Sequence, residues 1–253
     1  MDYTTSELFI VALSREIKDG DKITLAVEVP LCLIAWLLAK ETHAPNSSSW
    51  TLAGGIDPEP TSIPLSTGDP ALIENALSML DLSSKVGMVR FGRYDSVFLS
   101  GVQIDKYGNV NNSLIGTPER VKVRLPGGAG GAELIHIFKR VVLYRSKHNR
   151  QCFVEKVDFI TYPGWIESVT WRRGGPEQVI TNLAIMDFNT EDRRMRLVSV
   201  HPGISVDEVV QNTEFELVIP SDLGETPPPT KEELDLIRNK IDPENLRDSQ
   251  FIR

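Results

Sequence analysis

The chain has 253 residues, of which 41% are hydrophobic and 25% are charged, and it carries a formal net charge of −8. This composition is ordinary for a globular protein, and the length is sufficient to bury a full core in one large domain. The negative charge argues against a general surface for nucleic acid or for anionic membranes. We therefore expect no nucleic acid and no membrane among its partners.

The N-terminus and the two cysteines are typical of a cytoplasmic protein. Residues 1–7 are too acidic and polar for a signal peptide. Cys32 and Cys152 lie far apart, with no C-x-x-C and no histidine at ligand spacing, which predicts buried, reduced thiols and no metal site. The most apolar run, residues 29–39, is too short to span a bilayer and indicates a buried helix.

In the first part of the chain, helix and strand patterns alternate. Thr5 is a suitable helix cap, and the apolar spacing after it predicts a helix up to residue 17. Further along, the patterns predict a strand over 22–27, a helix over 30–42, a strand over 49–53 and a helix over 69–80.

The second part of the chain continues this alternation. The patterns predict strands near 96–101 and 121–125, a helix from residue 132, strands over 140–144, 157–160, 179–181, 184–188 and 195–201, a helix capped by Ser205, and a last helix over 231–240. Such alternation predicts an α/β fold, a mainly parallel open sheet with helices on both faces. We expect one domain over 1–253, with a C-terminal arm and helix at about 222–253.

Residues 121–137 have the most informative local pattern. A short strand runs into Pro126 and is followed by Gly127, Gly128, Gly130 and Gly131, after which a helix begins. Glycine lets the backbone approach a ligand closely, and free N–H groups at a helix start attract negative charge. Such a loop can hold a phosphate, a carboxylate or the oxyanion that develops on a thioester carbonyl. A plain strand-to-helix connector is the alternative.

The residues before this loop carry a family resemblance. Residues 103–111 read Q-I-D-K-Y-G-N-V-N, a hairpin with a tight turn, and residues 128–132 read G-A-G-G-A. Both resemble motifs of the β subunit, or β half, of class I CoA-transferases of the glutaconate type. Further matches follow in the expected order along nearly the whole chain, at Pro30, 66–70, 201–203 and 229–248.

The resemblance implies the CoA-transferase architecture and an acyl-CoA thioester bound at the interface with an α subunit, in an α2β2 or larger heteromer. Coenzyme A would then be part of the substrate, with no permanently bound cofactor. Gly131 and Ala132 correspond to the backbone donors of an oxyanion hole, packing at the helix start being the alternative. The remaining residues assigned to the substrate site are Gly54, Gly55, Gln103, Asn111, Gly127, Gly128 and Gly130.

One motif of the family is missing. Its transferases carry a β-chain glutamate after the second strand, which forms a covalent glutamyl-CoA intermediate. The corresponding residues 49–58 read S-W-T-L-A-G-G-I-D-P, with an apolar residue or glycine at the glutamate position, within 52–54. Gly54 and Gly55 are kept, so we expect the pocket to be kept while acyl exchange by that route is excluded at this position.

Other carboxylates could replace this glutamate. Glu28 lies in the loop after the first strand and is the first candidate for a base, with helix capping or charge pairing as the alternative. Asp57 and Glu59 lie next to prolines, which favours a structural role in a turn. The acid could also belong to the α subunit.

Two diverged groups of the family resemble this chain in places. The β chains of cholesterol ring-opening hydrolases share its Ile-Asp-Pro and Leu-Arg-Asp ending, and the β chain of a glutaconyl thioester decarboxylase resembles residues 42–45 and 57–59. We therefore favour hydrolytic C–C ring opening or decarboxylation of an acyl-CoA. The alternatives are a true CoA-transferase with a relocated nucleophile, Glu28 being the first to test, and a non-catalytic subunit that only shapes the α chain.

Overall fold

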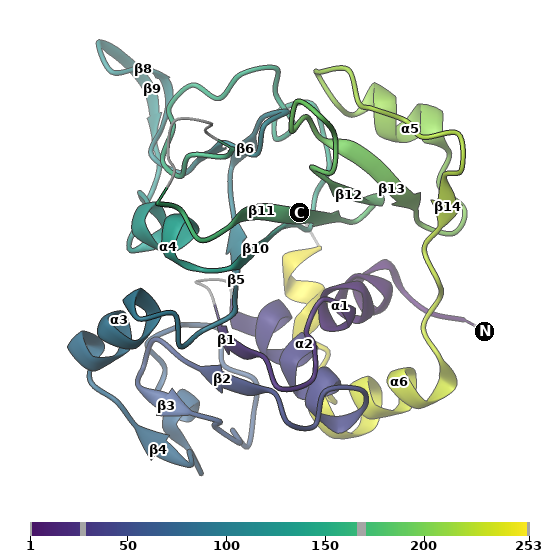
Figure 1. The fold of residues 1–253 in the computed structure, drawn as a ribbon. Helices are drawn as coiled ribbons and strands as arrows, with labels where there is room; N and C mark the ends of the chain where they lie inside the picture. The colour runs from purple at the N-terminus through teal and green to yellow at the C-terminus, as the bar shows by residue number, and fades with distance from the viewer. Residues whose placement is uncertain (1, 26–28, 166–170, 252–253) are drawn as a thin grey trace. The chain divides into compact units, whose positions relative to one another are not determined.

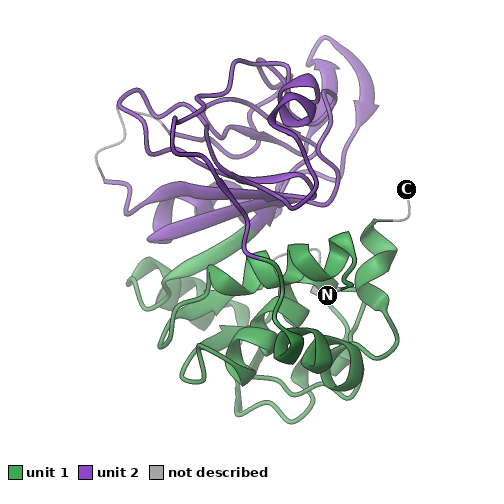
Figure 2. Cartoon of the chain, turned by 90° about the vertical axis from the view of Figure 1, so that its right-hand side faces the viewer, with its two compact units in different colours: residues 1–98, 228–253 green, residues 99–227 purple. Residues whose placement is uncertain are grey.

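The structure, a computed structural model, describes residues 2–25, 29–165 and 171–251. The chain divides into two compact units, which Figure 2 colours separately. Unit 1 comprises Met1–Phe98 and Pro228–Arg253, and unit 2 comprises Leu99–Pro227. The single domain expected over 1–253 stays a prediction. None of the helices in the described ranges combines the length and the apolar character that crossing a membrane requires.

Unit 1 is built on strands in the order β5-β1-β2-β3-β4 (Figure 1). The central strand β1 (Lys22–Thr24) runs parallel to β2 (Ser48–Trp50) and to β5 (Ser96–Ser100). The short strands β3 (Gly55–Ile56) and β4 (Ser78–Met79) continue the sheet in antiparallel orientation. The parallel centre follows from the crossover helix between β1 and β2.

Two helices supply most of the core of unit 1. α1 (Thr5–Arg15) packs against α2 (Val29–Glu41), the helix expected from the apolar run, and the side chains of Leu31, Leu33 and Trp36 are fully buried. The cap of α1 is Thr4 and not Thr5 as predicted. Thr4 Oγ1 accepts a hydrogen bond from the Glu7 N–H at 3.2 Å, and the Glu7 carboxylate accepts one from the Thr4 N–H at 2.8 Å.

The helix predicted over 69–80 is wrong. Only a single 3-10 turn forms, Pro70–Ile73, and the chain then turns at Asn75, which has a left-handed φ of 51°. The N–H of Leu77 donates to the Ile56 carbonyl at 2.9 Å, so this segment joins the sheet as β4. The helix that does form is α3 (Leu82–Arg90), whose first turn is capped by Asp81. Pairing with β3 has overridden the local helical pattern.

The C-terminal segment of unit 1 is anchored to α1 by buried charges. α6 (Lys231–Leu236) continues as a wider helical turn over Ile237–Ile241 and is followed by a 3-10 turn, Leu246–Gln250. Arg247, which is 4% exposed, donates to Asp242 at 2.8 Å and to Glu7 at 3.3 Å. Burial alone raises the Glu7 pKa, but hydrogen bonds from Arg238 and Thr4 and the charges of Arg238 and Arg247 outweigh burial and lower it.

Arg247→Met should therefore destabilise the chain by about 3–5 kcal/mol, because the Glu7 and Asp242 carboxylates remain buried with less compensating charge. Urea unfolding of both proteins measures the difference in the free energy of unfolding. Lys240→Met is the matched control: its pair with Glu41 is exposed, so we expect a loss of about 1 kcal/mol or less. Equal losses in the two variants would contradict this account.

Unit 2 contains strands in the order β10-β11-β12-β13-β14 (Figure 1). β10 and β11 run parallel, β12 and β13 continue antiparallel, and the short β14 runs parallel to β13. The bounds of these strands are Arg140–Arg145, Gly175–Thr181, Ala184–Asp187, Arg196–Val200 and Gly224–Glu225. The α/β fold class is as predicted.

Two hairpins and two short helices complete unit 2. The hairpins pair β6 (Gln103–Ile104) with β7 (Val110–Asn111) and β8 (Leu114–Thr117) with β9 (Arg120–Arg124). The helices are α4 (Gly131–Ile137) and α5 (Val206–Gln211), the latter capped by Ser205 as predicted.

The strand predicted over 157–160 is wrong, because bends replace it. The Asp158 N–H donates to the Gln103 side chain at 3.0 Å, and the Asp158 carboxylate accepts from the Gly116 N–H at 2.8 Å. These bonds to neighbouring hairpins take the place of a strand ladder.

A neutral histidine is buried in unit 2. The His148 ring stacks on Phe153, with 3.9 Å between ring centroids, and its two nitrogens lie 3.1 Å and 3.0 Å from the hydroxyl oxygens of Thr181 and Thr213. Burial lowers the pKa of His148 to about 3. The folded protein therefore does not bind a proton that the unfolded chain takes up below the ordinary histidine pKa of 6.5.

Stability should consequently fall as the pH drops from 6.5 towards 3, by at most about 1.4 kcal/mol per pH unit from this residue. Urea unfolding at a series of pH values measures the slope, and His148→Asn, which cannot ionise, is the comparison. We expect a shallower slope for the variant. An unchanged slope would show that His148 is not buried in the neutral form.

Candidate functional site

The glycine-rich loop lies in unit 2 between β9 and α4. Its first part is anchored because the Gly127 N–H donates to the Asn112 carbonyl at 2.7 Å. Gly127 and Ala129 both have positive φ values, 99° and 44°, so the chain turns sharply before the helix begins at Gly131. Ala129, Gly130 and Ala132 are exposed. The loop is therefore an ordered turn with its middle open to solvent.

Most of the amides of this loop are unused. Among the described residues, no acceptor is found for the N–H groups of Gly128, Ala129, Gly130 and Ala132. The Gly131 N–H, in contrast, donates to the Gly128 carbonyl at 2.8 Å and closes the turn. Unpaired amides at the start of a helix favour an anionic or partly anionic oxygen. The oxyanion roles of Gly131 and Ala132 stay predictions; of the two amides, that of Ala132 is free.

The ring of Tyr162 supports the loop from behind. Its hydroxyl donates to the Gly128 carbonyl at 3.1 Å and accepts from the Asn112 side chain at 3.3 Å. A Cβ on Gly131 would lie 2.5 Å from Tyr162 Cζ, and a Cβ on Gly128 would lie 2.6 Å from Thr161 Cγ2. Burial raises the Tyr162 pKa, which keeps its hydroxyl protonated as a donor. Glycine is thus required on the inner side of the loop.

Gln103 and Asn111 face each other across the β6–β7 hairpin. Asn111 Nδ2 donates to Gln103 Oε1 at 2.7 Å and to the Leu114 carbonyl, while Asn111 Oδ1 accepts from the Ser113 N–H at 2.9 Å. Asn111 is fully buried, and Gln103 is 7% exposed. Both side chains hold the hairpins that flank the glycine loop, and direct contact of either residue with substrate stays a prediction.

Gly54 and Gly55 lie in unit 1, at the turn between β2 and β3. Gly54 has a φ of 125°, and the Gly55 N–H donates to Thr51 Oγ1 at 3.1 Å. Leu52, within the segment where the glutamate of the transferases is expected, is 50% exposed. The Asp57 carboxylate accepts from the Ser49 N–H at 2.7 Å, which agrees with its expected structural role. Glu28 lies outside the described residues.

A lysine beneath this turn was not found from the sequence. Lys85 on α3 is 1% exposed, and its Nζ donates to the carbonyls of Thr51 at 3.0 Å and Leu52 at 3.4 Å. The same Nζ lies 4.7 Å from the centroid of the Trp50 ring, and burial lowers its pKa. The sequence does contain one indication of this burial: Lys85 lies four residues before Val89, on the same face of α3, and this face is buried.

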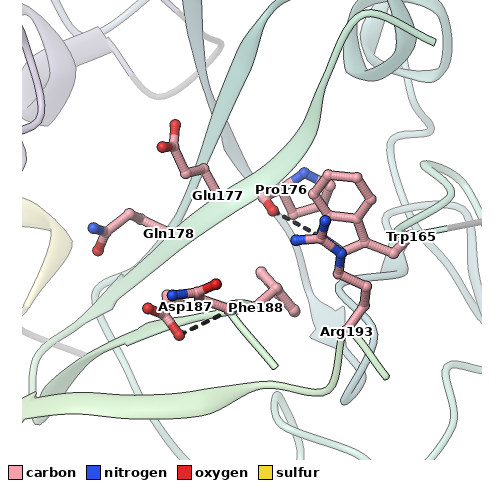
Figure 3. Close-up of a pocket in the computed structure, with 8 residues that line it drawn as sticks. Trp165, Pro176, Glu177, Gln178, Asp187, Phe188 and Arg193 are labelled. Carbon is pink, nitrogen blue, oxygen red and sulfur yellow. Dashed lines mark hydrogen bonds between the residues drawn. The ribbon is translucent and has the colours of Figure 1, made fainter. Parts of the chain in front are cut away.

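A separate cavity of about 260 Å³ lies in unit 2 beside β11 and β12 (Figure 3). The guanidinium of Arg193 stacks over the Trp165 ring at 4.5 Å, and Trp165 Nε1 donates to the Pro176 carbonyl at 2.8 Å. None of the predicted site residues that the structure describes is among its lining residues. In the described ranges, no group of three or more His, Cys, Asp or Glu side chains could hold a metal ion.

The loop geometry yields a matched pair of substitutions. Gly131→Ala places a methyl group against the Tyr162 ring and should cost about 1–3 kcal/mol of folding free energy. Gly130→Ala meets only Leu134, at 3.8 Å, and its φ of −81° suits alanine, so little change is expected. Thermal or urea unfolding distinguishes them. If both variants were equally stable, the ring of Tyr162 would not pack against the loop as described.

The chain is similar to known proteins along most of its length. Residues 6–212 match the family model described as Coenzyme A transferase. The chain is 32% identical to the B subunit of the 3-oxoadipate CoA-transferase of Pseudomonas knackmussii, covering 93% of this chain and 92% of that one. It is 31% identical to the B subunit of the glutaconate CoA-transferase of Acidaminococcus fermentans, covering 96% and 94%.

Diverged relatives are similar over the same length. The identity is 28% with the IpdB chain of the cholesterol ring-cleaving hydrolase of Mycobacterium bovis, covering 98% of both chains. The crystal structure of the decarboxylase AibA/AibB superposes with a TM-score of 0.89 at 26% identity, covering 98% of this chain and 99% of that one. The match to the family model and the matches along nearly the full chain agree with the expected architecture, and this chain belongs to the coenzyme A transferase family.

Proposed function

We propose that this chain is the β-type subunit of a heteromeric enzyme that acts on an acyl-CoA thioester. The observation that carries the proposal is the group of four amides, on Gly128, Ala129, Gly130 and Ala132, for which the described residues supply no acceptor, in a loop that Tyr162 supports. Such donors stabilise an oxygen that becomes negative during the reaction. Family membership supports a CoA thioester as the molecule that supplies this oxygen.

An α-type chain is the proposed partner. The two transferase relatives named above are B subunits, and the decarboxylase is a pair of different chains, AibA and AibB. Unit 1 also exposes large apolar side chains on and around β4 and α3, which a monomer rarely leaves uncovered. These are Leu77, Met79, Leu82, Met88 and Phe91, between 39% and 81% exposed.

The proposed chemistry is decarboxylation or hydrolytic C–C cleavage of the acyl group. The turn over 51–54 carries Leu52 and has no carboxylate, so a glutamyl-CoA carrier cannot form on it. In decarboxylation the bond to a carboxylate breaks and CO2 leaves; in hydrolytic cleavage water adds to a ketone carbon and the adjacent C–C bond breaks, which releases a carboxylic acid. In both reactions the electron pair of the broken bond is delocalised onto the thioester carbonyl oxygen, and a proton then adds to the carbon. The loop amides bind that oxygen more strongly as it becomes negative, which lowers the barrier without any covalent carrier.

Two alternatives remain open for the test. In one, the chain is a true CoA-transferase whose nucleophile has moved, with Glu28 as the first candidate. In the other, the chain only shapes an α partner that does the chemistry alone. In that second case, Gly131→Ala should leave turnover unchanged whenever the heteromer still assembles.

Covalent trapping distinguishes these proposals. The α–β complex is incubated with acyl-CoA, treated with borohydride to reduce any glutamyl-CoA thioester, and examined by mass spectrometry of this chain. We expect no modified glutamate in the natural chain, and modification at residue 52 in Leu52→Glu, with Leu52→Gln as the control. A modified glutamate in the natural chain would overturn the diverged chemistry, and its loss in Glu28→Gln would identify the relocated nucleophile.

A further inference from the structure

A half-buried cation, Arg172, lies close to the glycine loop of unit 2. Nη2 of Arg172 donates to the carbonyl oxygens of Ile135 at 3.1 Å and Pro163 at 3.3 Å, and Nη1 donates to the Gly164 carbonyl. Every acceptor that the described residues supply to this guanidinium is a backbone carbonyl. Arg172 Nε is buried and has no acceptor there. Burial lowers the Arg172 pKa to about 10, so the side chain is charged at neutral pH.

The carbonyls held by Arg172 belong to the two segments that define the loop. Ile135 lies in α4, the helix that begins where the loop ends. Pro163 and Gly164 directly follow Tyr162, whose ring supports Gly128 and Gly131. One nitrogen, Nη2, therefore bridges the helix that carries the loop and the segment that carries its support.

The supporting segment is fixed on its other side by the β6–β7 hairpin. The Gly164 N–H donates to Asn109 Oδ1 at 2.8 Å, and the Trp165 N–H donates to the Tyr107 carbonyl at 3.0 Å. Gly164 has no room for a side chain, because its Cβ would lie 2.5 Å from the Gly108 carbonyl carbon. Arg172 thus connects α4 to a segment that is itself immobilised.

We propose that Arg172 is a positioning residue for the glycine loop: by bridging Ile135 and Pro163 it keeps Tyr162 against the loop and so orients the unpaired amides. Its effect on catalysis rests on the proposed function, while its effect on the loop does not. A planar guanidinium with donors in a fixed fork suits three carbonyls, whereas a lysine ammonium on a flexible stem reaches fewer of them at once. Arg172→Lys should therefore keep part of the support for the loop that Arg172→Met loses.

The experiment measures amide hydrogen exchange and turnover in the assembled α–β complex. In Arg172→Met, exchange of the hydrogen-bonded amides within 127–134, which are those of Gly127, Gly131, Glu133 and Leu134, should rise at least about tenfold while β10–β12 stay protected. Arg172→Lys should lie between Arg172→Met and the natural chain, and Arg120→Met, at an exposed position on β9, should match the natural chain.

With the acyl-CoA used for trapping, kcat should fall about ten- to hundredfold in Arg172→Met with KM within about twofold, because Arg172 orients donors without touching substrate.

Each outcome decides a separate claim. If Arg172→Met folds and its exchange over 127–134 equals that of the natural chain, the positioning role is overturned. If Arg172→Met does not fold, Arg172→Lys decides instead: exchange equal to that of the natural chain would again overturn the positioning role. A rise in KM alone would assign Arg172 to substrate binding. If the natural complex turned over no acyl-CoA, the proposed function would fail, and the exchange measurements would still decide the role of Arg172.

Discussion

A backbone amide can be offered to a ligand only if other contacts hold the backbone that carries it. In this chain the contacts come from carbonyl oxygens and from the face of a ring: Tyr162 donates to the Gly128 carbonyl and fills the space beside Gly131. Glycine is consequently needed at Gly128 and Gly131, where the loop faces Thr161 and the ring, and the φ of 99° at Gly127 also favours glycine. These requirements account for three of the four glycines over 127–131.

Local sequence patterns predicted a helix or strand correctly where the residues of that element alone determine its structure. α5 and α6 begin at Ser205 and Thr230, whose side chains cap them. The position of the α1 cap differs by one residue because two threonines adjoin, and only Thr4 has a glutamate three residues later. Patterns failed where a partner distant in sequence determines the backbone. The segment over 69–80 has helical spacing, but pairing of Leu77 with Ile56 makes part of it a strand.

The same distinction applies to the candidate site. The glycine loop and the segment over 52–54, which has no carboxylate, can both be recognised in the sequence because each is a short, continuous stretch. Tyr162 and Arg172 are not, because neither lies in a periodic segment and each acts on a loop far away along the chain. The hairpin of Gln103 and Asn111 was found as a motif, although the structure uses both amides to hold backbone and neighbouring side chains. A motif therefore identifies residues that lie together in the fold, such as Gln103 and Asn111, more reliably than it assigns a role to each of them.

A cation that binds backbone carbonyls accompanies each glycine-bearing turn: in unit 1 it contacts the turn itself, and in unit 2 it contacts α4 and the segment after Tyr162. Lys85 donates to Thr51 and Leu52 in unit 1, and Arg172 donates to Ile135, Pro163 and Gly164 in unit 2. A carboxylate in either place would compete for the amide hydrogens, since it can only accept hydrogen bonds. A cation binds only the carbonyl oxygens of the backbone. The N–H groups, which are the groups that can bind an anion, therefore stay available.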